Sequence, residues 1–413
     1  MLTRRVVVTG MAGFSPIGND WESIRENLMR RRSGIRYMHE WERFAGLITR
    51  LGAPVEGFKL PDHYNRKNTR SMGRVSLMAT RATELALEDS GLLGDPVISN
   101  GRCGVAYGSS VGSTPAVADY GFMLLNNDIG NLNANTYIKM MGHTTAVNVA
   151  LFHKVRGRII PSVSACTSGS QGIGFAYEAI KFGMQDVMLA GGAEELCATE
   201  AAMFDALYAT STRNAEPHLT PRPFDRARDG LVIGEGACTF VLESMDRAVN
   251  RGARIYAEVV GFGTNADGTH VTQPNADIMQ VAMQLALEDA NISAREIGYV
   301  SAHGTATEQG DIAESHATAA IFGANTPISS FKSYTGHTLG ACGALEAMVA
   351  IQMMRENLFH PTLNLDELDP RCAELDYITG DMRKIATEWV MNNNFAFGGV
   401  NTSLIFRRWS DHD

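Results

Sequence analysis

The chain has 413 residues, enough for two or three domain-sized units and for a core that needs no disulfide to hold it together. Hydrophobic residues make up 45% and charged residues 20%, which is typical of globular proteins and unlike disordered or fibrous ones. A formal net charge of −9 without a long basic tract argues against nucleic-acid binding. The longest apolar runs are too short for a membrane-spanning helix, and six scattered cysteines indicate reduced thiols in a cytoplasmic protein.

Short β-branched runs alternate along the chain with longer helical patterns, which predicts an α/β layered fold. The expected strands are 5–9, 104–107, 158–162, 186–190, 237–242, 256–261, 299–301, 328–331, 389–394 and 402–406. The expected helices are 21–29, 74–89, 168–183, 244–251, 278–290, 314–322 and 343–356.

A coarse similarity relates the two halves of the chain. The strand at 5–9 is followed by a helix whose end contains Leu-Glu-Asp, and the strand at 256–261 is followed by a second helix that ends in the same way. Two related α/β halves, 1–250 and 251–413, would account for this. Because no low-complexity linker separates them, we expect the halves to pack as one body.

Cys166 lies between a predicted strand and a helix rich in small residues. A cysteine at a helix N-terminus faces unpaired backbone N–H groups and the positive end of the helix dipole, and both favour the thiolate. Cys166 is therefore a candidate nucleophile. The same pattern also fits a buried cysteine that acts as a small hydrophobic residue.

The strand predicted at 299–301 runs into a polar loop that contains His303, Thr305 and Thr307. The carboxyl ends of strands are where open α/β sheets place their ligands. His303 is therefore a candidate catalytic residue, and the two threonines are candidate contacts to an amide-bearing arm of a substrate. A histidine that only anchors the loop would show the same pattern.

A third segment has the same layout, with Lys332 and His337 following the strand at 328–331. The helix after it is apolar nearly all round and must be buried, so Glu346 is expected to be a buried carboxylate in need of a partner. Lys332 could supply that partner. Such an ion pair is compatible with either a catalytic or a structural role.

Phe395 and Phe397 precede a Gly-Gly turn between the last two predicted strands. Backbone N–H groups exposed in such a turn can form half of an oxyanion hole, although Gly-Gly turns are common. The glycine clusters elsewhere fit neither a dinucleotide nor a Walker pattern, and the histidines lack metal-ligand spacing. We expect neither a nucleotide cofactor nor a metal.

Taken in order, these motifs resemble those of the β-ketoacyl-acyl carrier protein synthases, and most closely the synthase I/II type of the thiolase superfamily. They are Cys166, then His-Gly-Thr-x-Thr-x-x-Gly-Asp from 303, Lys-Ser-x-x-Gly-His from 332, and Asn-x-Phe-x-Phe-Gly-Gly-x-Asn from 393. The resemblance extends over residues 5–406. It implies a thiolase-like fold, two related halves in a layered α-β-α-β-α body, and a homodimer.

The resemblance also implies residue roles. Cys166 would accept an acyl chain from acyl carrier protein. His303 and His337 would promote decarboxylation of malonyl-carrier protein and stabilise the enolate oxygen. Lys332, with Glu346 beside it, would orient this pair. The chain would then be elongated by two carbons through a decarboxylative Claisen condensation.

By the same resemblance, the backbone N–H groups of Cys166 and Phe397 would form the oxyanion hole, and the Phe397 side chain would act as a gate. Thr305 and Thr307 would contact the phosphopantetheine arm that carries the substrate, and Phe395 would line the substrate site. No other cofactor is implied.

Three positions bear on the acyl chain and the gate. Val111 matches a position that limits acyl length in the family, so a small valine predicts a deeper or wider pocket. Ala396 and Val400 stand where the family usually has Gly and Thr, which predicts a stiffer gating loop. Lys67, Arg70 and Arg213 match the family's docking positions for the acidic carrier protein, and Arg74 lies one helical turn beyond Arg70. An ordinary solvated basic face would have the same composition.

Two other functions compete with this interpretation. A biosynthetic thiolase is one, but the two histidines and the lysine fit malonyl decarboxylation better. A non-catalytic partner subunit resembling a chain-length factor is the other, and such subunits lack the nucleophile. The sequence leaves open whether the product is a fatty acid, a polyene or another polyketide. It also leaves open whether the protein is a homodimer or pairs with a chain-length-factor-like subunit, and whether a monovalent cation is bound.

Overall fold

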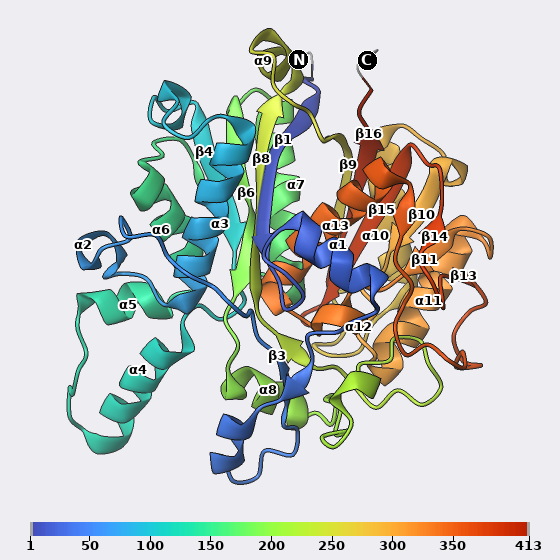
Figure 1. The fold of residues 1–413 in the computed structure, drawn as a ribbon, viewed down its shortest axis with the longest axis horizontal. Helices are drawn as coiled ribbons and strands as arrows, with labels where there is room; N and C mark the ends of the chain where they lie inside the picture. Colours follow the sequence, from blue (N-terminus) through green and yellow to red (C-terminus); the bar gives the residue numbers. More distant parts are fainter. Residues whose placement is uncertain (1–2, 411–413) are drawn as a thin grey trace.

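The computed structural model describes residues 3–410, and its centre is a mixed sheet of eleven strands (Figure 1). From one edge to the other the order is β13 (Asp376–Tyr377), β11 (Pro327–Ser329), β10 (Ile297–Ser301), β15 (Trp389–Ala396), β16 (Val400–Arg408), β9 (Ala257–Ala266), β1 (Val6–Phe14), β8 (Gly236–Ser244), β6 (Val187–Glu194), β4 (Cys103–Gly108) and β5 (Ile159–Pro161). Two small sheets consist of β2 (Arg36–Tyr37), β3 (Leu51–Ala53) and β7 (Ile233–Gly234), and of β12 (Leu358–Phe359) and β14 (Arg383–Lys384).

The large sheet repeats one pattern twice. In the first half, β1 pairs antiparallel with β8, β8 pairs antiparallel with β6, and β6, β4 and β5 run parallel. In the second half, β9, β16, β15, β10 and β11 follow the same order and the same directions. The halves join where β1 pairs antiparallel with β9. The internal similarity expected from the sequence is therefore present in the topology.

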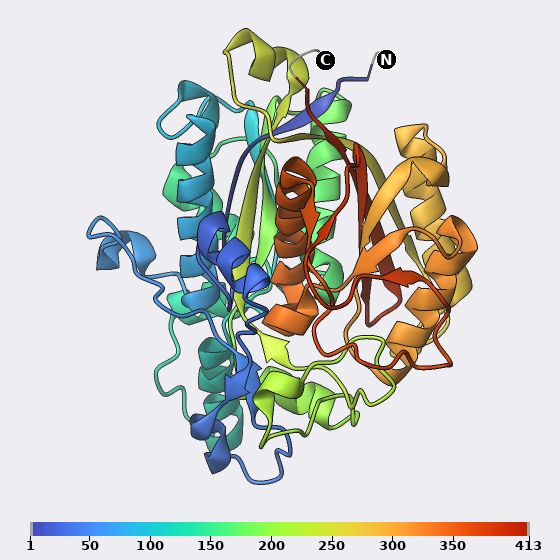
Figure 2. The ribbon, with the colours of Figure 1, turned by 45° about the vertical axis from the view of Figure 1, so that its right-hand side comes forward.

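Helices cover the sheet on the outside and fill the space between its halves. They are α1 (Trp21–Met29), α2 (Arg66–Thr69), α3 (Arg74–Ser90), α4 (Thr114–Asn126), α5 (Ala134–Met140), α6 (Thr144–His153), α7 (Ser168–Lys181), α8 (Ala198–Asp205), α9 (Met245–Asn250), α10 (Ala276–Ala290), α11 (Glu308–Phe322), α12 (Lys332–Thr335) and α13 (Cys342–Glu356). α3 and α6 pack on one outer face, and α10 and α11 on the other. α7 and α13 pack against each other between the two sheet halves (Figure 2). The layered α/β fold expected from the sequence is confirmed.

Small residues let the two central helices approach closely. A Cβ atom at Gly169 of α7 would lie 2.9 Å from the carbonyl oxygen of Gly340 and 3.0 Å from the nitrogen of Ala344 in α13. A Cβ at Gly174 would lie 2.3 Å from the ring of Phe262 on β9. The small residues of α7 are thus required by its position in the middle layer.

The predicted strands and helices all form, with shifted ends. α11 begins at Glu308, six residues before the predicted start at 314, because Thr307 is its N-cap. β11 ends at Ser329, short of 331, because the chain turns into α12 at Lys332. α4, α5 and α8 were not predicted. The domain boundary near residue 250 stays a prediction, since the sheet runs continuously across it. Between residues 3 and 410 we find no helix with the length and apolarity that a membrane crossing requires.

Candidate active site

The starts of the two central helices meet and bring the predicted catalytic residues together. Cys166 lies in a 3-10 turn, Ala165–Thr167, directly before α7. His337 lies between α12 and the 3-10 turn Leu339–Ala341, directly before α13. The thiol of Cys342, the first residue of α13, donates a hydrogen bond to the Cys166 carbonyl oxygen at 3.3 Å. The duplicated topology therefore builds one site from two equivalent positions.

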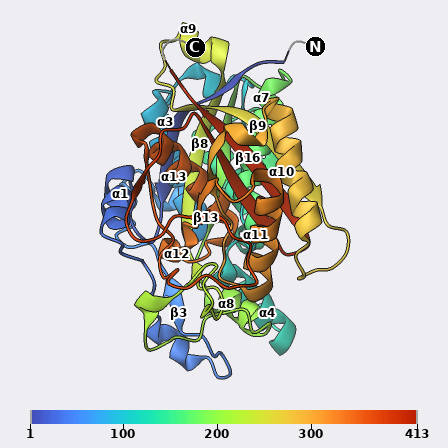
Figure 3. The same ribbon diagram turned by 90° about the vertical axis from the view of Figure 1, so that its right-hand side faces the viewer.

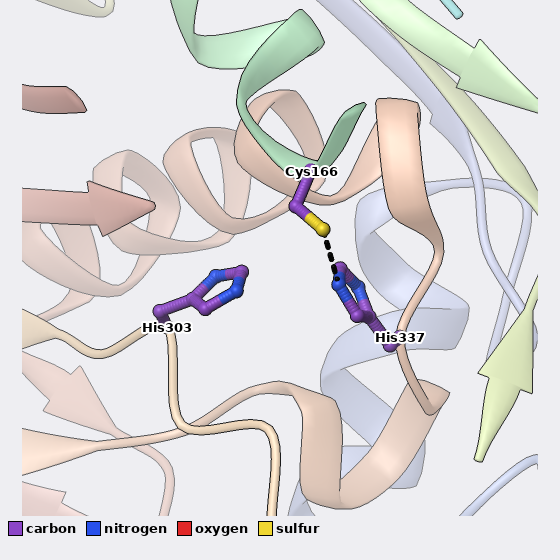
Figure 4. Close-up of side chains that lie close together, drawn as sticks. All are labelled: Cys166, His303 and His337. Atoms are coloured by element: carbon purple, nitrogen blue, oxygen red, sulfur yellow. Dashed lines mark hydrogen bonds between the residues drawn. The ribbon is translucent and has the colours of Figure 1, made fainter. Parts of the chain in front are cut away.

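His337 contacts the candidate nucleophile directly (Figure 4). Its Nε2 lies 2.9 Å from the Cys166 Sγ. The backbone N–H of Leu339 donates to its Nδ1 at 3.3 Å. Because Nδ1 accepts a hydrogen bond, the proton of a neutral ring must sit on Nε2. His337 therefore presents an N–H donor to the sulfur and is not placed to act as a base toward it.

His303 follows β10 and faces the same space. Its ring centroid lies 5.2 Å from that of His337, with the two rings nearly perpendicular. The Lys332 Nζ lies 3.1 Å from its Nδ1, and an ammonium group can only donate, so the ring proton again sits on Nε2. The site thus holds two neutral imidazoles that each offer an Nε2–H.

Lys332, Glu346 and Asn394 form a buried polar cluster behind His303. Lys332 and Glu346 form an ion pair, and the Asn394 amide donates to the other Glu346 oxygen at 2.7 Å. Burial lowers the pKa of Lys332, but the neighbouring Cys342 and Glu346, with the hydrogen bond to Glu346, outweigh this effect and raise it. Lys332 therefore stays an ammonium next to His303. The predicted pairing of Lys332 with Glu346 is present in the structure.

Burial dominates the electrostatics of Cys166, which is 5% exposed. It raises the pKa of the Cys166 thiol to about 12, although Lys332 and the backbone N–H groups of Phe397 and Cys166 lower it. Burial therefore opposes the stabilisation of the thiolate that the sequence predicted from the helix terminus, because desolvation of the charged sulfur raises the pKa more than the neighbouring charge and N–H groups lower it.

Both histidines are held neutral. Burial lowers the pKa of His303 well below its usual value, and Lys332 and then His337 lower it further. Burial and Lys332 act in the same direction on the pKa of His337. Two neutral N–H donors in a buried site are what an oxyanion hole requires.

A cavity of about 390 Å³ opens onto Cys166, His303 and His337. Thr305 and Thr307 line its polar side, with their hydroxyl oxygens 2.8 Å apart. Phe395, Phe397 and Phe204 line its apolar side. The Phe397 ring stands against Phe204, with centroids 5.3 Å apart.

Three further residues support the site and were not singled out from the sequence. Glu314 accepts the backbone N–H groups of His303 at 2.7 Å and Gly304 at 2.6 Å, and burial raises its pKa to about 8. Asp311 holds the N–H of Thr305 at 3.0 Å, and burial raises its pKa to about 6. Asn394 completes the set. Asp311 and Asn394 lie within the quoted motifs, and that position was the available signal for them.

The remaining predicted positions lie apart from this cavity. The N–H of Val111 points to the Glu194 carboxylate at 3.4 Å, and Val111 is not among the residues that line the cavity. Arg74 forms an ion pair with the buried Glu235, and Arg213 lies 3.6 Å from Asp229. Lys67 and Arg70 are exposed on α2 and directly after it, with no ion-pair partner in the described part of the chain.

The donor atoms of Cys166, His303 and His337 lie within 4.8 Å of one another, close enough for a metal ion. The same holds for His303, Cys342 and Glu346. In both sets the chemistry opposes a cation, since the Nε2 atoms that face Cys166 carry protons and the Lys332 ammonium already lies against His303 and Glu346. The absence of a metal stays a prediction.

Comparison with known proteins agrees with this geometry. Residues 3–248 match the β-ketoacyl synthase N-terminal domain, and residues 256–366 match the C-terminal domain. The 3-oxoacyl-[acyl-carrier-protein] synthase 2 of Vibrio cholerae is 39% identical, over 99% of this chain and all of the relative.

Solved structures show the same fold. A β-ketoacyl synthase from Burkholderia phymatum is 60% identical with a TM-score of 0.97, covering 98% of this chain and all of the other. The ishigamide ketosynthase/chain length factor is 30% identical with a TM-score of 0.89, covering 99% of this chain and all of the other. The fold and site therefore define a condensing enzyme of the acyltransferase class. The chain belongs to the β-ketoacyl synthase family.

Proposed function

We propose that the protein elongates a Cys166-bound acyl chain by two carbons, using malonyl-acyl carrier protein as the donor, in the ketosynthase reaction of its family. The observation that carries the proposal is the placement of two neutral Nε2–H donors, from His303 and His337, around one buried thiol. A non-catalytic partner subunit would have no use for this arrangement.

In the first half-reaction, the Cys166 sulfur attacks the carbonyl carbon of an acyl thioester on the carrier protein. As the tetrahedral intermediate forms and collapses, the thiol proton passes to the departing carrier thiolate, so the carrier leaves as a free thiol. The backbone N–H groups of Cys166 and Phe397 already lower the pKa of the sulfur, so they lie where they can also receive the oxyanion of the tetrahedral intermediate. Acyl transfer before condensation gives ping-pong kinetics.

In the second half-reaction, malonyl-carrier protein loses carbon dioxide, and the electron pair of the broken bond becomes an enolate. The Nε2–H groups of His303 and His337 donate to the enolate oxygen. The enolate carbon then attacks the Cys166 thioester, releasing the cysteine sulfur and the β-ketoacyl product. Removal of either imidazole donor is expected to cost about 2.7–4 kcal/mol of barrier, as in other oxyanion holes.

Intact-mass analysis tests this function. Wild-type protein and Cys166→Ala are mixed with acyl-carrier proteins of varied chain type and then with malonyl-carrier protein. Acylation of the wild type alone, followed by a product two carbons longer, is the expected result. Acylation only from polyenoyl or aryl donors would assign a specialised pathway. No acylation from any donor would reject catalysis and favour the partner-subunit function.

For carrier-protein docking we propose Lys67 and Arg70, with Arg74 and Arg213 tied to acidic side chains at the margin of the surface. An acidic carrier protein needs a local basic surface on a chain whose net charge is −9. Arg70→Glu is expected to raise the KM for carrier-bound substrates and leave kcat unchanged. The matched control is Arg32→Glu, an exposed arginine elsewhere. Equal kinetics for both variants would reject the assignment.

We also propose that the protein works as a dimer, either with a second copy of itself or with a chain-length-factor-like subunit. β5 lies at one edge of the large sheet, and helix α4 leaves large apolar side chains exposed. The ishigamide neighbour is named as a ketosynthase with a chain length factor, which makes the heterodimer a specific alternative.

A further inference from the structure

Glu200 is a buried carboxylic acid that the mechanism above does not use. It lies on α8, is 1% exposed, and neither of its carboxyl oxygens has a hydrogen-bond partner among residues 3–410. The backbone N–H of Cys197 is close enough to lower its pKa slightly but does not reach hydrogen-bonding geometry. A buried polar group left without a partner is costly, so its retention calls for a ligand or a local structural role.

The helical geometry of α8 shows which way Glu200 faces. Successive residues of an α-helix are about 100° apart, so Glu200 lies about 40° around the axis of α8 from Phe204, which lines the active-site cavity. Ala198 and Ala202 lie on the opposite side of α8 and line a separate surface groove with Phe44. Glu200 therefore shares the side of α8 that carries Phe204, one turn away, and lies behind the residues that line the cavity.

Apart from the carboxylates of Glu194 and Glu195, the residues near this side of α8 are apolar. Cys166, Ala201 and Phe204 belong to one cluster of buried hydrophobic residues, together with Leu339. Phe397 packs against this cluster, with its ring centroid 5.3 Å from that of Phe204. An acyl chain on Cys166 that extended away from the polar Thr305 and Thr307 would enter this cluster.

Glu200 is in its neutral form. Burial raises its pKa well above the usual value, and the neighbouring charges of Glu194 and Glu195 add to this effect. These two neighbours are already engaged, since Glu194 accepts the Ser110 N–H at 2.6 Å and Glu195 accepts the Thr114 N–H at 2.9 Å. Glu200 therefore offers an O–H donor and a carbonyl acceptor to whatever approaches it.

Building on the proposed ketosynthase reaction, we propose that the Glu200 carboxyl hydrogen-bonds an oxygen substituent on the Cys166-bound acyl chain and so selects oxygen-bearing chains over plain saturated ones. A saturated chain packed on Glu200 would leave the carboxyl desolvated and unpartnered. A hydroxyl or other oxygen at the right depth removes this penalty. Because Glu200 lies about 6 Å along α8 from Phe204, the substituent belongs on the distal part of a medium-length chain.

The test compares donors that differ only in a terminal hydroxyl. Octanoyl-carrier protein is set against 8-hydroxyoctanoyl-carrier protein, with the corresponding six- and ten-carbon pairs to find the depth, and the rate of Cys166 acylation is followed by intact mass. Wild type is expected to prefer one hydroxylated donor by about ten- to a hundredfold, the effect of one unsatisfied buried group. Glu200→Met should abolish or reverse this preference, whereas Glu200→Gln should keep most of it.

Controls separate the possible outcomes. Met203→Leu alters an exposed residue of the same helix and should leave the preference unchanged. Equal donor preferences in wild type and Glu200→Met would overturn the proposal and leave the ketosynthase function intact. In that case, a lowered unfolding temperature of Glu200→Met would assign Glu200 a structural role at the start of α8. Failure of every protein to be acylated by any donor would instead overturn the proposed function.

Discussion

At the residue scale, two opposing effects set the reactivity of Cys166. Burial raises the pKa of its thiol, and the neighbouring backbone N–H donors lower it. The sulfur has the His337 Nε2 at 2.9 Å, yet its pKa is raised to about 12 because the thiolate is poorly solvated. Deprotonation must therefore accompany attack on a bound thioester. We therefore expect Cys166 to resist unspecific modification and to react when a thioester substrate occupies the site.

We predict that alkylation of Cys166 by iodoacetamide rises with pH without levelling off below pH 9. A thiol with a pKa of about 12 gains roughly tenfold in thiolate per pH unit throughout this range. The measurement is the labelling rate by mass spectrometry, with Cys166→Ala to account for the other cysteines. A plateau between pH 6 and 8 would show an activated resting thiolate and contradict the prediction.

The buried ion pair of Lys332 and Glu346 affects both the stability of the fold and catalysis, and substitutions can separate the two effects. Lys332→Met leaves the Glu346 carboxylate buried and unpaired, so the free energy of unfolding should fall by about 3–5 kcal/mol in denaturant titrations. The double variant Lys332→Met/Glu346→Leu removes both charges and should recover much of that loss. Both variants should decarboxylate malonyl-carrier protein much more slowly, measured as carbon dioxide release, because His303 loses the ammonium donor that fixes its tautomer and keeps only the Asn394 amide at 3.4 Å.

The pH dependence of decarboxylation provides an independent readout of Lys332. Its ammonium charge lowers the pKa of His303, so in wild type the rate should stay level as pH falls from 8 to 6. Without this charge the His303 pKa rises, and the residual rate of the double variant should begin to fall at a higher pH. An unchanged acid limb would mean that burial alone keeps His303 neutral.

The sequence predicted which residues meet at the candidate site better than it predicted their electrostatic state. Cys166, His303, Lys332 and His337 each follow a predicted strand, and strand ends in an α/β sheet converge. The raised pKa of Cys166 could not be predicted, because it depends on how completely the two halves enclose the sulfur. The pairing of Arg74 with Glu235 joins residues 161 positions apart, and neither residue type indicates its partner.

At the element scale, the hairpin formed by β15 and β16 holds the backbone N–H of Phe397, which we propose as one donor of the oxyanion hole. Its loop contains Phe397, Gly398 and Gly399, and the two glycines have φ of +87° and +71°. A Cβ at Gly399 would lie 2.8 Å from the Cβ of Asp267, whereas a Cβ at Gly398 would meet nothing within 4 Å. The two positions therefore form a matched pair for separating backbone strain from a steric collision.

We predict that Gly399→Ala slows acylation of Cys166 at least about tenfold more than Gly398→Ala does. Both substitutions place alanine in the left-handed region, at a cost of about 1–2 kcal/mol. Only the first must also push the loop away from Asp267, which displaces the Phe397 N–H from the sulfur. Acylation rates from intact mass, with thermal unfolding of both variants alongside, provide the measurement. Equal acylation rates would show that the loop absorbs the collision without moving Phe397.

Elements with strong periodicity were predictable, and those stabilised by distant contacts were not. α1 and α3 begin at the predicted residues, since their buried positions recur at helical spacing. α4 exposes several of its hydrophobic residues, so its apolar side chains do not indicate an intramolecular face. α8 carries Glu200 buried and Met203 exposed, the reverse of what residue polarity alone predicts.

At the scale of the whole molecule, the duplicated topology explains why the active site is central while the carrier-bound substrate enters from outside. The equivalent helices α7 and α13 start at the same place, so each half contributes one side of the site. The outer helices cover the faces of the sheet, and its two edge strands are β13 and β5. α4, α8 and β3 lie at the same end of the molecule (Figures 1 and 3).

The exposed side of α4 leads to our last prediction, a dimer interface. Leu124 and Leu125 are 77% and 85% exposed, and contiguous apolar surface of this kind marks a protein contact. Sedimentation or light scattering should give twice the mass of one chain for the wild type. Leu124→Asp/Leu125→Asp should give the mass of a single chain, because two charges cannot be buried there without partners.

Leu93→Asp, at an exposed leucine after α3, should stay dimeric. A wild type that is monomeric alone but forms a stable complex with a chain-length-factor-like subunit would show that this face serves a heterodimer, since the same apolar surface then pairs with a different chain.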